Sequence, residues 1–325
     1  MEETINILNV WKKYKQSTEF ALKDISLKFF NNEIHVLLGF NGSGKSTLLK
    51  LIARLLILSK GQILLKNNEW NNSVRAFKRE MGVLFDHNAQ WEQLTGYENA
   101  WFFASSYGLA KQEISSRLEY YFKWLNLWDK KDELVKKYSY GMRRKLTLIE
   151  CLIHDPKILL LDEPSMGLDY HSRVAFYQNL KERASDGALI IVASNDVNEA
   201  AFLADKVTIL DKGKVVATGE PKELMKSLKP YIKINISLNF PIRLANLRKV
   251  EGLTELEIID NEKGTNNFKI MILAKPKEIS SYSMVLADIV NEIVKENGQI
   301  QHIDIKNPNL GDLFLKIKSE DHESQ

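Results

Sequence analysis

Apolar and polar positions alternate along the first part of the chain with the period of a β-strand. The alternation covers residues 5–10 and 21–29, which predicts two strands joined as a hairpin. The run 34–38 is almost wholly apolar and lies between Asn32 and a glycine, which indicates a short buried strand. A helical pattern over 47–58 follows the glycines. This order of strand, glycine-rich loop and helix is the context that a phosphate-binding loop requires.

Residues 92–136 have helical periodicity and many aromatic side chains. We interpret the rings as packing between the helices of a subdomain, and an exposed aromatic groove that docks a partner is the alternative. The aromatic residues are Trp101, Phe102, Phe103, Tyr120, Tyr121, Phe122, Trp124 and Trp128.

Beyond residue 140 the pattern alternates between helix and strand. Such alternation is typical of a mainly parallel sheet covered by helices, which is an α/β fold. The expected helices end near residue 154 and cover 170–185 and 197–203; the expected strands cover 157–161 and 188–193; a hairpin joins 206–210 to 215–217.

A second domain is expected after a change in composition at 219–221 and a short helix that ends near residue 228. We predict domain boundaries of 1–228 and 229–325. The order β-α-β-β-α-β favours a small α+β domain of the ferredoxin-like type. Its expected elements are strands at 231–238, 253–259, 267–274 and 301–305, and helices at 241–248 and 282–295.

Composition indicates an ordinary globular protein. Of the 325 residues, 44% are hydrophobic and 27% charged, and a net charge of +3 is too small to favour nucleic acid as a partner. The single cysteine, Cys151, excludes an internal disulfide and is expected in the core. No apolar run approaches the roughly 20 residues of a membrane span. Any passage through a membrane is therefore expected from another chain.

One segment fits the phosphate-loop pattern G-x-x-x-x-G-K-[ST] in full. Its glycines allow backbone N–H groups to turn toward phosphate oxygens, and the next helix adds a favourable dipole. We expect Lys45 to reach the β- and γ-phosphates of ATP and Ser46 to bind Mg²⁺. The expected nucleotide-binding residues of this loop are Gly39, Asn41, Gly42, Ser43, Gly44, Lys45, Ser46 and Thr47.

Two adjacent acids follow the apolar strand at 157–161. Asp162 is expected to hold Mg²⁺ opposite the glycine loop, and Glu163 to polarise an attacking water as general base. Alone, this pair fits two solvated acids at a strand end equally well. Paired with the glycine loop and Lys45, it predicts a site that hydrolyses a nucleotide.

The segment Tyr138-Ser139-Tyr140-Gly141-Met142 resembles the L-S-G-G-Q signature of ABC-type ATPases. Ser139 and Gly141 match that signature, and the other three positions depart from it. The resemblance covers roughly residues 4–228. It implies a P-loop ATPase domain with a mainly parallel sheet, an antiparallel β subdomain and a helical subdomain at about 87–142. It also implies that Ser139 and Gly141 cap the γ-phosphate bound by a second ATPase subunit, in a homodimer.

Two further segments follow the order of the ABC family. Tyr14 lies where the family places an aromatic ring that stacks on adenine, and Trp11 is the other candidate. The segment 165–169 resembles the D-loop, whose Asp169 helps to join the two subunits.

Two positions depart from the family in ways that affect the chemistry. Asp86 stands where a glutamine usually touches Mg²⁺ and the attacking water, and we expect its carboxylate to ligate the metal. His87 and Gln90 are the alternatives for that position. Asn195 stands where a histidine usually contacts the γ-phosphate; its amide donates a hydrogen bond but carries no charge. A slower enzyme is expected, and a site that binds ATP without hydrolysing it is the sharper alternative.

The leading interpretation is the ATPase subunit of an ABC transporter, which closes around two Mg-ATP and drives a separate multi-span membrane permease. The segments 94–99, 219–224 and 308–315 resemble the export-type ABC-2 group, so export is favoured over import. We expect a cytoplasmic protein held at the inner face of the membrane by its permease. A weakly hydrolysing regulatory subunit is one alternative. A soluble ABC-type mechanoenzyme acting on DNA or ribosomes fits less well, because the chain has neither a long coiled coil nor tandem modules.

Overall fold

The chain divides into two units, Met1–Pro221 and Lys222–Gln325. The computed structural model describes residues 3–65, 68–69, 79–85, 90–227, 232–238, 253–261, 268–274 and 282–306. This division lies seven residues before the domain boundary that we predicted after residue 228. Each unit is described by itself.

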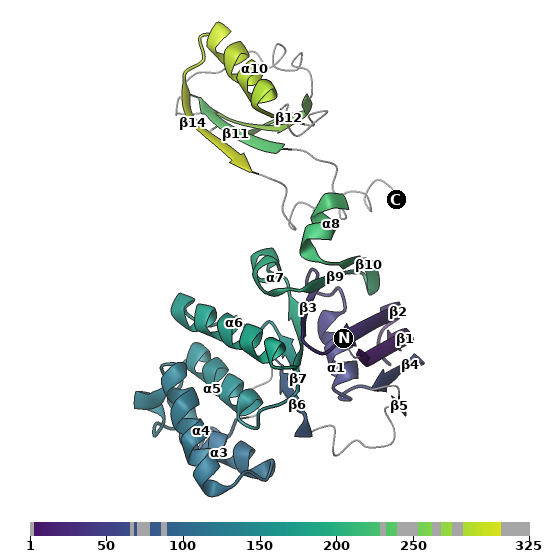
Figure 1. Cartoon of the computed structure of the whole chain (residues 1–325), viewed down its shortest axis with the longest axis vertical. Helices are drawn as coiled ribbons and strands as arrows, with labels where there is room; N and C mark the ends of the chain where they lie inside the picture. Colours follow the sequence, from purple (N-terminus) through teal and green to yellow (C-terminus); the bar gives the residue numbers. More distant parts are fainter. Residues whose placement is uncertain are drawn as a thin grey trace. The chain divides into compact units, whose positions relative to one another are not determined.

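A six-stranded sheet forms the centre of the first unit (Figure 1). All neighbouring strands run parallel except the edge pair β10–β9, which confirms the predicted mainly parallel α/β fold. Strand β6 was not predicted, because four residues are too few to display a period. The order is β10 (Lys214–Gly219), β9 (Lys206–Asp211), β3 (Glu33–Leu38), β8 (Leu189–Ser194), β7 (Ile158–Asp162) and β6 (Met81–Leu84).

A second, antiparallel sheet contains the predicted hairpin of β1 (Glu3–Lys13) and β2 (Phe20–Phe30). Strand β4 (Lys60–Leu65) pairs with the other side of β1, and β5 (Asn68–Glu69) completes the order β2-β1-β4-β5. We had not predicted β4, because its first half is polar and exposed and contains Gly61. The antiparallel β subdomain expected from the sequence is confirmed.

Helix α1 (Lys45–Ile52) lies between these two sheets (Figure 1). Its Leu48 and Leu49 are fully buried in one hydrophobic cluster with residues of both sheets. The prediction of helix to residue 58 was wrong. Arg54 has a φ of 57°, which is incompatible with a continuing right-handed helix, and Ile57 beyond it is 85% exposed.

The remaining helices of the first unit cover the other face of the six-stranded sheet and form the helical part near β6 (Figure 1). Asp169 caps the N-terminus of α6, and Thr95 forms a capping box with Glu98 at α3, so the helices begin where side chains satisfy free N–H groups. None of the helices in the described part of the chain is both long and apolar enough to cross a bilayer. The helices are α3 (Gly96–Ser106), α4 (Lys111–Trp124), α5 (Tyr140–Leu152), α6 (Tyr170–Ser185) and α7 (Val197–Leu203). Helix α8 (Pro221–Ser227) begins at the last residue of this unit and belongs to the second.

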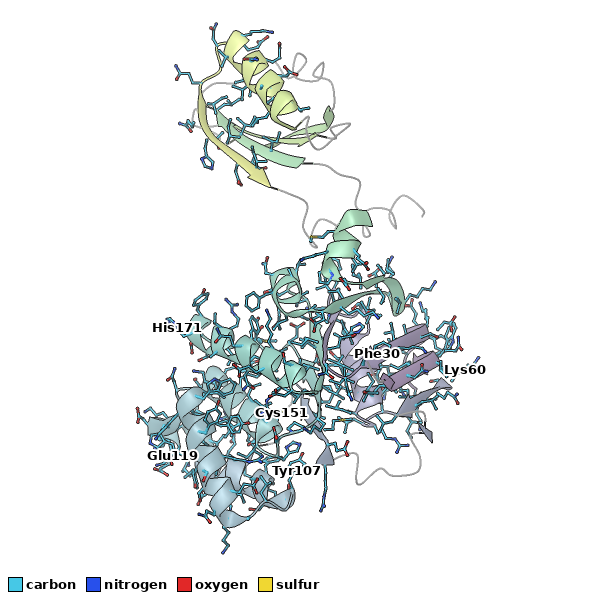
Figure 2. All side chains as sticks on the ribbon, in the orientation of Figure 1. Phe30, Lys60, Tyr107, Glu119, Cys151 and His171 are labelled. Atoms are coloured by element: carbon cyan, nitrogen blue, oxygen red, sulfur yellow. The ribbon has the colours of Figure 1, made fainter. Side chains whose placement is uncertain are left out.

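The aromatic residues of the helical part are divided between core and surface. Phe122 and Tyr121 are buried, as the packing interpretation predicts, whereas Phe102 and Tyr120 are about half exposed. The expected core position of Cys151 is confirmed, and Figure 2 shows it inside the unit between the helices and the sheet.

The second unit contains an antiparallel sheet in the order β12-β13-β11-β14. Its first strand therefore lies between the third and the fourth, which is the strand order of the ferredoxin-like fold expected here. Buried Ile289 and Ile293 of α10 and Ile234 and Ile236 of β11 are part of its core. The predicted helix at 241–248 lies outside the described residues. The elements are β11 (Ile232–Leu238), β12 (Leu253–Asn261), β13 (Phe268–Ala274), α10 (Tyr282–Lys295) and β14 (Ile300–Lys306).

Candidate active site

Three parallel strands end side by side at one edge of the central sheet. Leu38, at the end of β3, is paired with Ser194 at the end of β8, and Asp162 of β7 is paired with Ala193. The glycine loop follows β3, the two acids end β7, and Asn195 follows β8. The sheet register therefore brings together segments that are far apart in the sequence, at the carboxyl edge where open α/β sheets bind ligands.

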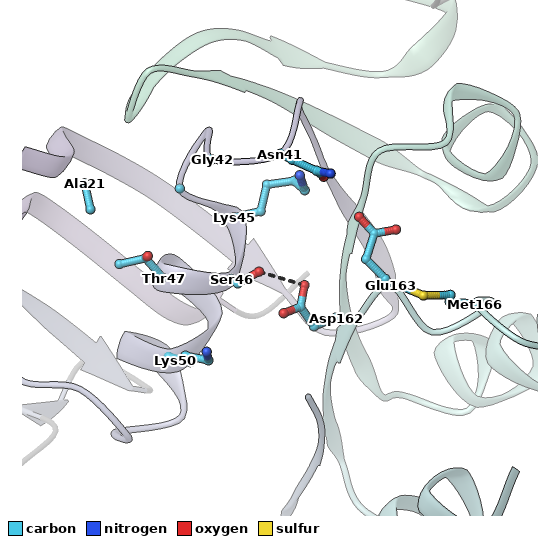
Figure 3. Close-up of a pocket in the computed structure, with 11 residues that line it drawn as sticks. Ala21, Asn41, Gly42, Lys45, Ser46, Thr47, Lys50, Asp162, Glu163 and Met166 are labelled. Carbon is cyan, nitrogen blue, oxygen red and sulfur yellow. Dashed lines mark hydrogen bonds between the residues drawn. The ribbon is translucent and has the colours of Figure 1, made fainter. Parts of the chain in front are cut away.

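A pocket of ≈ 490 Å³ opens at this edge. Figure 3 shows the glycine loop on one side of it and the two acids on the other. Eight of the residues that line it were expected in the site from the sequence, and Ala21, Lys50 and Met166 are additions. The lining residues are Ala21, Asn41, Gly42, Gly44, Lys45, Ser46, Thr47, Lys50, Asp162, Glu163 and Met166.

The loop from Gly39 to Gly44 needs glycine at two positions for different reasons. Gly44 has a φ of 108°, and a Cβ there would lie 2.6 Å from Leu22 Cδ2 and 2.8 Å from the Ala21 carbonyl oxygen. A Cβ on Gly39 would lie 2.4 Å from Ser43 Oγ. The loop is thus closely packed on its protein side. Helix α1 begins directly after it, so the free N–H groups of the first turn lie at the pocket.

Lys45 and Ser46 begin helix α1 on the floor of this pocket. The Lys45 ammonium donates to the carbonyl oxygens of Gly39 (2.8 Å) and Phe40 (3.1 Å). Ser46 Oγ donates to Asp162 Oδ1 at 3.0 Å, the contact drawn in Figure 3. The Ser46 hydroxyl and the Asp162 carboxylate are therefore in direct contact in the pocket, although 116 positions separate them in the sequence.

Burial shifts the proton affinities of the charged groups in the pocket. It raises the pKa of Asp162, against the hydrogen bond from Ser46 and the charge of Lys45. It also raises the pKa of Glu163, against the charge of Lys45 and the backbone N–H of Asn195. Burial lowers the pKa of Lys45, and both acids oppose that change. Two acids and one amine in a partly dry pocket are suited to binding an anion together with a cation.

The pocket contains oxygen donors that fit a magnesium ion. Ser46 Oγ and Asp162 Oδ1 are hard oxygen ligands, and Mg²⁺ is usually held by one or two carboxylates together with substrate phosphates and water. Across the described residues, no cluster of three or more His, Cys, Asp or Glu side chains resembles an all-protein metal cage. The third expected ligand, Asp86, lies outside the described residues, as does its alternative His87.

Asn195 lies beside the pocket. Its backbone N–H hydrogen-bonds the Glu163 carboxylate, and its side-chain amide donates to Asn41 Oδ1 at 3.4 Å. Asn195 therefore connects the general-base candidate to the glycine loop.

Tyr14 and Ser139 lie outside the pocket lining. Tyr14 is 39% exposed, and its hydroxyl lies 3.1 Å from Thr47 Oγ1. The other adenine candidate, Trp11, packs edge-on against Phe20. Ser139 caps α5 and accepts a hydrogen bond from the N–H of Met142. Its role in a second subunit's site stays a prediction, as does that of Gly141.

Arg144 is a residue that the sequence reasoning missed. It lies on α5 and is 4% exposed. Its guanidinium donates to the carbonyl oxygens of both Asp162 and Glu163. A signal was present in the sequence, because Arg144 interrupts the apolar stripe of α5 four positions before buried Leu148.

Comparison with known proteins agrees with this geometry. A model of the ABC transporter family matches residues 22–166. The ABC transporter ATP-binding protein NatA of Bacillus subtilis (strain 168) is 33% identical over 214 residues, which cover 66% of this chain and 87% of NatA. The chain belongs to the ATP-binding proteins of ABC transporters. It is an ATPase of that family, and ATP is its nucleotide.

Other ABC proteins are also similar to this chain. The linearmycin resistance ATP-binding protein LnrL of the same organism is 26% identical over 95% of this chain and 96% of LnrL. A dimeric bacterial ABC transporter cassette superposes with a TM-score of 0.61 and 25% identity, over 66% of this chain and 98% of the cassette. Mammalian sub-family A proteins also match, and the chain spans 20% of their length. The expected membership of the ABC-2 group of ABC ATPases is confirmed.

Proposed function

We propose that the pocket binds Mg-ATP and that Glu163 activates the water that attacks the γ-phosphate. The observation that carries this proposal is the meeting of Ser46 and Asp162 at 3.0 Å, with Lys45 and Glu163 in the same pocket. The loop amides and the Lys45 ammonium bind the phosphates, and Ser46 and Asp162 hold Mg²⁺. When bound there, the ion would offset the negative charge of the phosphates.

Hydrolysis requires a base that accepts a proton from water. Burial raises the pKa of Glu163, which makes its carboxylate a better proton acceptor than an exposed glutamate. The water oxygen forms a bond to the γ-phosphorus as the bond to the β,γ-bridging oxygen breaks. ADP leaves with that electron pair, and Glu163 takes the water proton. Asn195 stabilises the phosphate by a neutral hydrogen bond, and we expect this to give a slower rate than a histidine.

We propose a homodimer in which each chain completes the other's site. Ser139 and Gly141 lie at the N-terminus of α5 but do not line the pocket formed by their own chain. Their N-terminal amides are suited to a second anionic ligand, as helix N-termini are in general. The similarity to a dimeric bacterial ABC cassette supports this assembly.

We further propose that the dimer drives a separate membrane permease in export, from the cytoplasmic face of the membrane. No helix in the described ranges is suited to spanning a bilayer. The similarity to LnrL, a resistance protein by name, supports export rather than import.

The test of the catalytic roles is phosphate release by the purified chain and by Glu163→Gln. We expect the variant to bind ATP as tightly and to hydrolyse it 10²- to 10⁴-fold more slowly. Equal rates of phosphate release would refute the role of Glu163. Co-purification of a multi-span membrane protein from native membranes tests the permease, and recovery of the chain with ribosomes or DNA would refute it.

A further inference from the structure

The guanidinium of Arg144 contacts three backbone carbonyls that surround the acidic side of the pocket. It donates to the carbonyl oxygens of Asp162 at 2.5 Å and Glu163 at 2.7 Å, and to that of Phe85 at 3.2 Å. Its side chain is almost completely buried. A planar guanidinium has several donors in fixed directions, so these contacts also fix the carbonyls relative to one another.

The two acids need such a donor because the sheet ends beside them. Strand β6 ends at Leu84, which is paired with Leu161, so no residue of β6 pairs with Asp162. A buried carbonyl without a donor is costly, and Arg144 supplies the donor that a longer β6 would have supplied. Helix α5 thereby holds the end of β7 from outside the sheet.

Glu163 depends on this support more than Asp162 does. Its φ of 47° is in the left-handed region, which residues with a Cβ seldom occupy. The backbone is held on one side by the hydrogen bond from the Glu163 N–H to the Ala193 carbonyl oxygen, at 2.9 Å, and on the other by Arg144. Figure 3 shows the result, with the Glu163 carboxylate on the side of the pocket that faces Lys45 and Asn41.

We propose that Arg144 is a positioning residue for hydrolysis, which orients the Asp162 and Glu163 side chains by fixing their backbone. It acts through these two residues and makes no contact with the nucleotide itself. The inference rests on the roles proposed for Asp162 and Glu163.

The test uses the full chain with Arg144→Met, which keeps an unbranched apolar stem in the buried position and removes every donor. We expect kcat to fall about ten- to hundredfold, the loss typical of a misplaced catalytic group, while KM and ATP affinity change less than about twofold. Arg144→Lys keeps the positive charge but has fewer donors, and we expect its kcat to lie between those of the wild type and Arg144→Met. Arg117→Met is the matched control, because Arg117 donates to the carbonyl of Ile153 at the other end of α5, and its kcat is expected to stay unchanged.

A double-mutant cycle separates positioning from a general structural role. In the Glu163→Gln background Arg144→Met has no base to orient and can act only through Asp162, so we expect a clearly smaller fold-loss in kcat than in the wild-type background. An equal fold-loss in both backgrounds, an unchanged kcat, or joint loss of folding and ATP binding would each overturn the proposal. The rate of Glu163→Gln alone tests the proposed general base. If that rate equals the wild-type rate, the role of Glu163 fails, and this result is distinct from a failure of the role of Arg144.

Discussion

Glu150 is a buried carboxyl on α5 whose removal should change how stability depends on pH. It is 7% exposed, its Oε1 has no hydrogen-bond partner among the described residues, and burial raises its pKa to about 8 although Gln90 hydrogen-bonds the side chain. The folded chain therefore keeps Glu150 protonated up to about pH 8, whereas in the unfolded chain it ionises near 4.5. Folding takes up a proton between these values, so stability falls as pH rises through that window.

The magnitude follows from the difference in proton binding. A full proton taken up on folding changes the free energy of unfolding by about 1.4 kcal/mol per pH unit. Glu150→Gln keeps the shape and cannot ionise, so this dependence disappears. Relative to the wild type, the variant should gain stability as pH rises from 6 to 8, by up to about 3 kcal/mol at complete proton uptake.

Cys151 provides the assay because it is the chain's only cysteine and is adjacent to Glu150. The thiol is buried, which raises its pKa to about 12 and keeps reagents out, so we expect labelling only after the first unit opens. Comparing wild type and variant at each pH cancels the reagent's own pH dependence. We expect the wild-type to variant ratio of labelling rates to rise up to tenfold per pH unit.

The control is Glu119→Gln, an exposed glutamate paired with Lys123 on the outer side of α4 (Figure 2), whose ratio should stay near one. A ratio for Glu150→Gln that does not change between pH 6 and 8 would refute the reasoning. It would mean that Glu150 is already ionised in the folded chain.

Three further substitutions test the site. Gly44→Ala should weaken ATP binding more than tenfold in a titration, because its Cβ would lie 2.6 Å from Leu22. The control is Gly187→Ala, where the φ is similar but no atom lies near the new Cβ; it should leave ATP binding unchanged. Asn195→His should raise kcat severalfold, because imidazole can carry charge at the γ-phosphate, and a lower kcat in steady-state assays would contradict this. Tyr140→Gly loses the contact with Met166 and should lower the free energy of unfolding by about 1 kcal/mol, as measured by thermal unfolding. ATP affinity should not change, because Tyr140 does not line the pocket; weaker ATP binding would contradict this.

The sequence predicted the strands that carry the chemistry within one or two residues, because apolar runs such as 34–38 end at glycines or acids. It failed where polarity or special backbone conformation decides the structure. Strand β4 begins with exposed polar residues, and α1 stops early because Arg54 is left-handed. Arg144 was missed for another reason. Its place in the apolar stripe of α5 marks it as buried, but its partners are backbone carbonyls, which no sequence pattern identifies.

Helix α5 links these observations to the proposed dimer. Its first residues, Ser139 and Gly141, are the ones expected to reach the nucleotide of the second chain. Three and four positions beyond Gly141, Arg144 holds the acids of its own pocket and Lys145 pairs with Asp169 at 2.9 Å. A displacement of α5 would therefore move groups at two sites at once: Glu163 in the pocket of the same chain, and the residues that contact the γ-phosphate bound by the second chain. Because one helix carries both sets of contacts, we expect hydrolysis in one pocket and capping of the other to be mechanically coupled in the proposed dimer.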